Sequence, residues 1–304
     1  MSCDAPNSLL LALSLASFLP QLGVLLVRRD SSGMSPFYVL SNLLCATEQL
    51  TFIFLSAVIT PDEPLITHSP LTLGDWINLG HTAAVWVLWL IVYVHTSPPL
   101  LPLLPLLLLA SVSRLTTVRR RPRFVLSLSF LPGHGGSRAA AAAICFVHLL
   151  VSVVPQFMTV LLLPDPRQGV YINLDLTQIL FWGHILLVLP ATTVIRILGV
   201  WLQAREVVSH LPGLPPPLSK ASLRLQAVVF AVVAVSWLGR LPSHAHNILG
   251  DSLSLTLIYW FAINDGILAA GQALLLWLVG GGRTESTIAA TSEETEPLLG
   301  RASC

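Results

Sequence analysis

Residues 8–28 read SLLLALSLASFLPQLGVLLVR, an apolar run whose only charged residue is Arg28 at its end. A helix of about 20 apolar residues crosses the hydrocarbon core of a bilayer. The leader from Met1 to Ser8 carries Asp4 and no Lys or Arg, whereas a secretory signal begins with positive charge. We therefore interpret this run as a retained membrane span.

Composition supports the same class for the whole chain of 304 residues. Hydrophobic residues make up 54% and charged residues 10%, and the mean hydropathy is +0.77. Ordinary soluble domains carry about 25% charged residues. Because a helix satisfies its own backbone hydrogen bonds inside lipid, the expected fold class is an all-α membrane protein. The formal net charge of +1 gives no reason to expect a nucleic-acid partner.

Seven stretches have the length and hydropathy of a span, and an eighth apolar segment, 98–115, is rich in proline. Lys and Arg concentrate in cytosolic loops. The distribution of these residues can therefore decide between seven and eight spans. The seven stretches are 8–28, 36–59, 76–95, 140–163, 175–202, 223–241 and 252–280.

Seven spans with the N-terminus outside give the better charge distribution. The cytosolic side then receives all of the 16 basic residues except Arg167, Arg196 and Arg240. Arg196 lies inside the fifth stretch, near its cytosolic end. If 98–115 also spanned, the arginine cluster at 119–123 would be translocated, against the rule. We expect a luminal N-terminus and a cytosolic C-terminus, with a true eighth span as the alternative.

A motif lies at the end of the first span. Residues 17–21 read Ser-Phe-Leu-Pro-Gln, and a basic pair at 28–29 is followed by Gly33-Met-Ser35. This pattern resembles the PQ-loop motif of a family that includes the lysosomal cystine exporter cystinosin, the SWEET sugar transporters and the KDEL receptor. The continuation 37–49 is similar to a fungal branch of that family.

The resemblance implies an architecture of two parallel three-helix bundles joined by a linker helix. We also expect the proline-containing loop 203–222 to be extended and mobile, and the Ser-, Thr- and Glu-rich tail to be disordered. The implied parts are a first repeat with the motif (1–95), a cytosolic or interfacial loop (96–139), a linker helix (140–163), a second repeat (175–280) and the tail (281–304).

The second repeat should carry a motif of its own. Pro155-Gln156 lies in the linker, which runs opposite to the first span. Pro190 lies in a span parallel to the first, but Ala191 stands where the glutamine should be, and no Gly-x-Ser follows. We therefore expect a degenerate second repeat, with Pro190 as its hinge.

The first motif also has a purely physical interpretation. Pro20 removes a backbone N–H and kinks the helix near mid-membrane. Gln21 can bind the freed carbonyl or face a polar cavity, and Gly33 allows a tight return into the next span. The alternative to a functional motif is a kinked helix followed by an ordinary turn that ends at Ser35.

Two acidic residues lie halfway along predicted spans, Glu48 beside Gln49 and Asp265 beside Asn264. An ionised side chain in the bilayer is costly, so each should face the bundle interior. Each could be a protonatable coupling group, and the alternative is a hydrogen-bonded packing group. Some family members carry an acidic residue two positions after the motif serine, but here that position is Phe37, so coupling by it cannot be carried over.

Asn78 and His81, one turn apart in the third span, could line the same cavity. The SWEET-like members place asparagines of the third and seventh spans against the substrate, which by resemblance singles out Asn78 and Asn264. Three further polar residues are expected to pack or to hydrogen-bond between helices, namely His148, Gln178 and His184.

The tail carries Glu294 followed by Leu298 and Leu299. This spacing fits the acidic dileucine pattern that sorts membrane proteins to vacuoles or lysosomes, and it implies a clathrin adaptor as a partner. The sequence has no catalytic signature and no metal- or cofactor-binding motif, so we expect no cofactor.

Three function classes follow. The first is a transporter of a small polar solute, an amino acid or a sugar, across an endomembrane, with or without proton coupling. The second is a non-transporting receptor or trafficking protein of the same fold. The third is a membrane-embedded enzyme of the cyclase type, which also uses intramembrane acids.

Overall fold

The computed structural model describes residues 4–28, 33–59, 71–96, 143–144, 146–148, 150–152, 182–209, 218–238 and 248–293. The regular secondary structure in these ranges is entirely helical. Six helices are long and apolar enough to cross a membrane, as expected for an all-α integral membrane protein. The proline-rich segment 98–115 and most of the expected linker lie outside the described residues.

Two short π-helical turns extend the spanning helices. The turn η1 continues α2, and the turn η3 leads into α7. Proline is well placed in the first turn of α2, because the N–H that it lacks would have no helical acceptor there. The elements are α1 (Asp4–Arg28), α2 (Pro36–Phe54), η1 (Leu55–Ile59), α3 (Leu73–Thr96), η3 (His184–Val188), α7 (Leu189–Ser209), α8 (Lys220–Leu238) and α9 (Ile248–Glu293).

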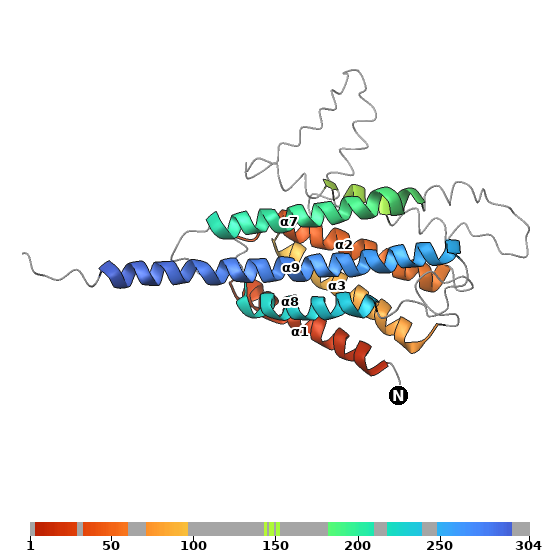
Figure 1. Cartoon of the computed structure of the whole chain (residues 1–304), viewed down its shortest axis with the longest axis horizontal. Coiled ribbons are helices and arrows are strands. Elements are labelled where there is room, and N and C mark those ends of the chain that lie inside the picture. Colours follow the sequence, from red (N-terminus) through yellow and green to blue (C-terminus); the bar gives the residue numbers. More distant parts are fainter. Residues whose placement is uncertain are drawn as a thin grey trace, which may run out of the picture.

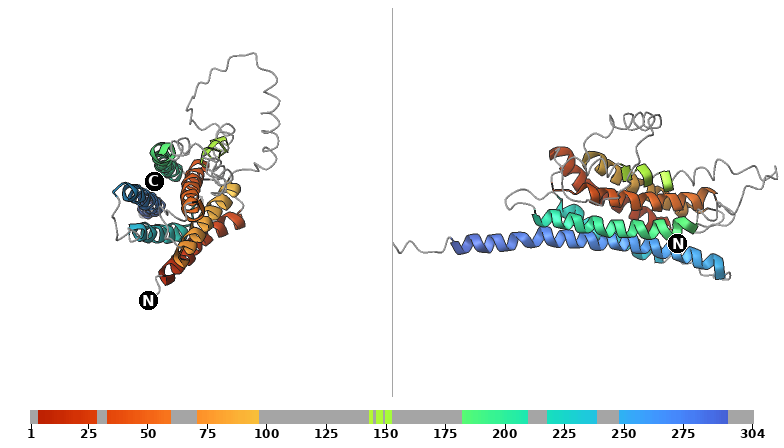
Figure 2. Two further views of the ribbon diagram at one scale, coloured as in Figure 1. Left: turned by 90° about the vertical axis from the view of Figure 1, so that its right-hand side faces the viewer. Right: turned by 90° about the horizontal axis from the view of Figure 1, so that it is seen from above.

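The six long helices form two groups of three, called here the first unit (α1, α2 and α3) and the second unit (α7, α8 and α9). In the first unit α3 packs against both α1 and α2, and in the second unit α9 packs against both α7 and α8. Between the units, α1 packs against α8, and α2 packs against α7. The helices run side by side as a closed ring with the same internal order in each unit (Figures 1 and 2).

Side-chain contacts fix the directions within the first unit. Ser14 of α1 contacts His81 of α3, and Phe18 contacts Trp89 further along both helices. The helices α1 and α3 therefore run in the same direction. The helix α2 is antiparallel to both, because Tyr38 near its start contacts Trp89 of α3 and Thr47 further along contacts the earlier Trp86. We call the end of the bundle where α1 and α3 end and α2 begins the Gly33 end.

The same argument gives the directions in the second unit. Thr192 of α7 contacts Cys45 of α2, whereas Gln203 contacts Ser35 at the beginning of α2, so α7 is antiparallel to α2. It is therefore parallel to α1. The backbone oxygen of Leu189 and the side chain of Thr193 meet Trp260 and Asn264 of α9 in that order, so α9 is parallel to α7.

The outer surface of the bundle is apolar, and α2 is the most buried of the six helices. Within the membrane-crossing windows, 83% of the α2 residues are buried, against 33–44% in the other five helices. Large apolar side chains such as Leu187 and Trp277 point outward, with 72% and 70% of their surface exposed. This distribution suits contact with lipid on the outside and places the polar residues of α2 between the two units.

Two boundaries differ from those predicted. The helix α7 continues to Ser209 and α8 begins at Lys220, so both ends of the loop expected at 203–222 are helical. The helix α9 continues to Glu293, although the tail from 281 onward was expected to be disordered. No proline interrupts the chain there before Pro297. With 46 residues, roughly 70 Å at 1.5 Å per residue, α9 extends beyond the rest of the bundle (Figure 1).

Candidate functional site

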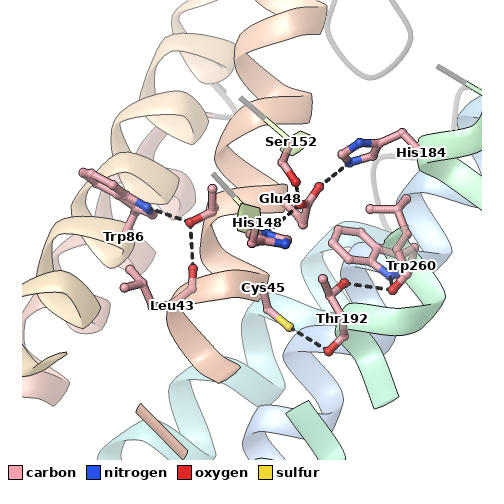
Figure 3. Close-up of polar contacts among 11 residues, drawn as sticks. Leu43, Cys45, Glu48, Trp86, His148, Ser152, His184, Thr192 and Trp260 are labelled. Carbon is pink, nitrogen blue, oxygen red and sulfur yellow. Dashed lines mark hydrogen bonds and ion pairs between the residues drawn. The ribbon is translucent and has the colours of Figure 1, made fainter. Parts of the chain in front are cut away.

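Glu48 forms a buried cluster with three other side chains. It is fully buried in α2, and its Oε1 accepts a 2.5 Å hydrogen bond from the Ser152 hydroxyl (Figure 3). The His184 ring nitrogen Nε2 contacts the other carboxylate oxygen, Oε2. His148 Nε2 lies 2.8 Å from Oε1, at ion-pair distance but without hydrogen-bond geometry. A carboxylate between two imidazoles is able to hold or release a proton.

Local helix geometry brings these partners to Glu48. His184 opens the π-helical turn η3, and such turns recur at functional sites, where they re-aim a side chain. The Phe52 ring packs edge-on against the His184 ring, with 5.2 Å between the ring centroids. His148 and Ser152, four residues apart, share one face of a helical segment. The prediction that the two histidines hydrogen-bond or pack between helices did not foresee that both converge on one carboxylate.

Asp265 lies in a second buried cluster, between the two units. Gln49 Nε2 of the first unit donates a 3.0 Å hydrogen bond to Oδ1, and Trp237 Nε1 of the second unit donates a 3.0 Å hydrogen bond to Oδ2. Although Gln49 follows Glu48 directly, the two acidic residues have different partners. Sequence reasoning singled out both acids correctly as interior residues, and the structure assigns them to separate clusters.

A third cluster surrounds Arg196, which is 1% exposed and is the largest fully buried side chain among the described residues. Its Nε donates to Asn42 Oδ1 at 3.1 Å, and its Nη1 donates to the backbone oxygen of Asn264 at 2.8 Å. The sequence placed Arg196 near the end of its span. That was wrong, because the span covers His184–Ser209 and Arg196 lies at its middle.

A small cavity of about 20 Å³ lies between the units, toward the Gly33 end, with room for about one water molecule. Two buried atoms at its wall, Gln272 Oε1 and Trp89 Nε1, have no hydrogen-bond partner within the described part of the chain. Gln272 Nε2 donates to the Tyr38 hydroxyl at 2.5 Å. The other lining residues are Phe18, Gln21, Met34, Val92, Leu218, Ser222, Leu223 and Gln226.

Two glutamines cross between the units beside this cavity. Gln21 of α1 accepts a 2.8 Å hydrogen bond from the backbone N–H of Ser219, which precedes α8. Gln203 of α7 accepts a 2.7 Å hydrogen bond from the backbone N–H of Ser35, which precedes α2, and donates to the Gly33 oxygen at 2.9 Å. Each glutamine thus binds the start of a helix in the other unit. We call these two contacts the glutamine latches.

The latches clarify the sequence motif. Gly33 has a φ of 78°, which confirms the predicted tight return. Pro20 lies inside α1, which continues through it. Pro190 is exposed on α7, and the glutamine that seemed to be missing after it has its structural counterpart in Gln203. The signal in the sequence was Leu202-Gln203 followed by Ser219, a spacing that a search anchored on proline overlooks.

The remaining predicted residues have different outcomes. His81 Nε2 lies 2.8 Å from Ser14 Oγ, which is an internal contact of the first unit. Asn264 lies in the Arg196 cluster, where its Nδ2 donates to Thr193 Oγ1 at 3.2 Å. Asn78 is half-buried, and its backbone oxygen accepts a hydrogen bond from Thr82. The sorting pattern of Glu294, Leu298 and Leu299 lies outside the described residues, as do Pro155, Gln156 and Gln178.

The described residues contain no group of three or more His, Cys, Asp or Glu side chains that could hold a metal ion. Comparison with protein-family models, with curated proteins and with solved structures finds no match for this chain. The function must therefore be argued from the site itself.

Proposed function

We propose that the chain is a transporter that moves a small polar solute through the interface between the two units. This proposal rests on one observation, a row of buried polar residues along the side of α2 that faces the second unit. Tyr38, Asn42, Glu48 and Gln49 are all at most 6% exposed, in a bundle whose outer surface is apolar. Polar groups inside a membrane are costly, and they mark solute and proton pathways.

The helix arrangement supports an alternating-access mechanism. Two units with the same internal order meet through two pairs of helices, α1 with α8 and α2 with α7. The helix α3 ends at the Gly33 end, whereas α7 begins at the opposite end, which is what a single linker span between them requires. This is the arrangement expected for a PQ-loop protein with two three-helix bundles and a linker helix, in which one bundle rocks against the other.

The glutamine latches act as a gate in this proposal. Met34 and Leu218 line the cavity at the Gly33 end and are 6% and 4% exposed. Met34 directly precedes Ser35, and Leu218 directly precedes Ser219. The latches bind these two serines and therefore fix the two apolar side chains at the cavity. In this conformation the cavity behind these two side chains has room for about one water molecule. Because α1 ends in Arg28 and α8 begins with Lys220, we assign the Gly33 end to the cytosol.

Glu48 supplies the coupling group. Its partners come from two parts of the chain: His148 and Ser152 lie in the proposed linker, and His184 belongs to the second unit. Movement of the units against each other would change which imidazole faces the carboxylate. Uptake or release of a proton by this cluster is thereby tied to the conformation.

A solute screen on the purified protein tests the proposal. Thermal unfolding is followed in detergent with neutral and charged amino acids, sugars and organic acids, at pH 5 and at pH 7. A solute that binds the folded state raises the unfolding midpoint by mass action. We expect at least one pH-dependent hit, lost or made independent of pH in Glu48→Gln and unchanged in Glu206→Gln, an exposed acid on α7. Uptake of that solute into proteoliposomes should follow the same order.

Silence across the panel, from protein shown to be folded and monodisperse, would contradict transport. It would favour the receptor or trafficking class, which has the same fold but does not move a solute across the membrane. A hit that survives in Glu48→Gln with its pH dependence intact would leave transport standing and remove the coupling role of Glu48. Vacuolar or lysosomal sorting through Glu294, Leu298 and Leu299 is a separate part of the proposal, tested by locating a tagged chain with both leucines changed to alanine.

A further inference from the structure

The charge on Arg196 has no counter-charge in direct contact within the described part of the chain. An arginine keeps its proton under all ordinary conditions, and a charge buried away from water is stable only when it is paired. The side chain is 1% exposed at the middle of its span. Its two hydrogen-bond acceptors, the Asn42 amide and the Asn264 backbone oxygen, are both neutral. Among the described residues no carboxylate lies within ion-pair distance of the guanidinium.

Part of the guanidinium is also unused. The two hydrogen bonds occupy Nε and Nη1, and Nη2 has no acceptor among the residues described by the structure. The nearest acidic candidates along the pathway are engaged elsewhere, because Glu48 binds Ser152 and the two histidines, and Asp265 binds Gln49 and Trp237. The site thus combines a fixed positive charge with N–H donors that the described residues do not engage.

The neighbours of Arg196 orient it rather than neutralise it. Asn42 Nδ2 donates to the backbone oxygen of Tyr38 at 2.8 Å, which turns its side-chain oxygen toward Arg196. Asn264 is held in turn by Thr193 and by the backbone oxygen of Trp260. The guanidinium is therefore pre-organised across the boundary between the units, since α2 belongs to the first unit and α9 to the second.

We propose that Arg196 binds the carboxylate of the transported solute, so that the substrate class is a small organic acid or another solute with a free carboxylate. This inference rests on the transport function proposed above. The planar guanidinium matches a carboxylate through two parallel N–H···O bonds. A carboxylate that arrives with the solute supplies a counter-charge to a guanidinium that already contacts both units.

The test compares matched charged and neutral probes on the full chain. Thermal unfolding midpoints are measured with acetate, lactate and succinate, with the neutral succinamide, with inorganic phosphate and with glucose, all at one ionic strength. Phosphatidylglycerol in the micelle is a separate arm, to detect a lipid headgroup as the anion. Each probe is applied to the wild type, Arg196→Lys, Arg196→Gln and Arg224→Gln, in which an exposed arginine of α8 is the control.

We expect at least one carboxylate to raise the midpoint by several degrees in the wild type and in Arg224→Gln, with no shift from succinamide. Truncating one partner of a buried charge pair leaves the other charge unpaired, so Arg196→Gln should bind that carboxylate about 100-fold more weakly, which corresponds to about 2.7 kcal/mol. Arg196→Lys keeps the charge without the planar pair of donors and should be intermediate. If Arg196→Gln does not fold, the lysine variant and the contrast between succinate and succinamide still decide.

The opposite results are equally specific. A carboxylate shift that persists in folded Arg196→Gln, or an equal shift from succinamide, would overturn the inference. A shift from phosphate or phosphatidylglycerol alone would replace the carboxylate by that anion. If glucose binds and is transported while every carboxylate is silent, this inference fails and the transport function stands. If no probe binds and no solute is taken up, both fail.

Discussion

The two units are built on one plan but carry different chemistry. Gln21 in the first unit and Gln203 in the second make the same contact, each with the start of a helix in the other unit. Seven residues before these glutamines lie Ser14 and Arg196, respectively. Both are buried, at 0% and 1% exposed, so equivalent positions hold a neutral hydroxyl in one unit and a full charge in the other.

The third helices repeat this relation. His81 contacts Ser14 in the first unit, and Asn264 contacts Arg196 in the second. Trp89 and Gln272 each lie eight residues further along and line the same cavity. The frame is therefore repeated, and the charged groups Arg196 and Asp265 are particular to the second unit. A repeated frame suits rocking, whereas a polar solute needs an asymmetric site that fixes its orientation.

The close approach of α7 to α2 provides the first and strongest test of the comparison between the two units. A Cβ added at Gly199 would lie 2.1 Å from Ser41 Oγ and 3.3 Å from the Tyr38 Cα. Gly199 lies four residues before Gln203, and the equivalent position in α1, four residues before Gln21, is the buried Ser17. The first unit therefore accommodates a side chain at this position. We expect Gly199→Ala to lower the free energy of unfolding by about 2 kcal/mol, since overpacking a tight contact costs about 1–3 kcal/mol.

The matched control is Gly266→Ala on α9, where an added Cβ meets nothing within 4 Å. Alanine is the better helix former by up to about 1 kcal/mol, so this change should be neutral or slightly stabilising. Both variants are compared by unfolding in mixed micelles, with helicity followed by circular dichroism. Equal stability of the two variants would show that the α2–α7 contact is looser than described.

The glutamine latches provide the second test of the comparison. Because both units make the same contact, we expect the two substitutions to have equal effects on stability. Gln21→Leu removes the acceptor for the Ser219 N–H, and Gln203→Leu removes the acceptor for the Ser35 N–H. An unsatisfied backbone donor costs about 1–3 kcal/mol when buried, so we expect about 1 kcal/mol for each partly buried latch. Both variants should also label faster at a cysteine introduced at Met34, because the gate opens more often.

All four native cysteines are changed to alanine in every labelling experiment, so that the cysteine introduced at position 34 is the one that reacts: Cys3, Cys45, Cys145 and Cys304. Ser209→Ala near the end of α7 is the control, since this exposed hydroxyl bonds only within its own turn. A large effect from Gln21→Leu with none from Gln203→Leu would mean that the second unit has lost the gate function and that the shared contact is a remnant.

The sequence predicted the class of fold and the interior acids, because both depend on local signals. Hydropathy over about 20 residues identifies a span, and a charge in its middle has to face inward. It did not predict the Glu48 cluster, because His184 lies 136 residues away and is one of several lone polar groups on apolar helices. It also misplaced Arg196, because hydropathy ended that span too early, at the charged residues that α7 carries through to Ser209.

The smallest expected effect concerns the proline of the motif. The position equivalent to Pro20 in the second unit is Leu202, and α7 still places Gln203 in its latch. The latch geometry therefore does not require proline.

An interior proline costs a helix about 3 kcal/mol relative to alanine, but α1 is already packed around Pro20. We expect Pro20→Ala to change the free energy of unfolding by less than about 1 kcal/mol and to leave the labelling rate at position 34 unchanged. Leu19→Ala, at a neighbouring side chain with 63% of its surface exposed, is the control. A loss above about 2 kcal/mol, or labelling as fast as in Gln21→Leu, would show that the two units reach the same contact by different means, the first through its kink and the second without one.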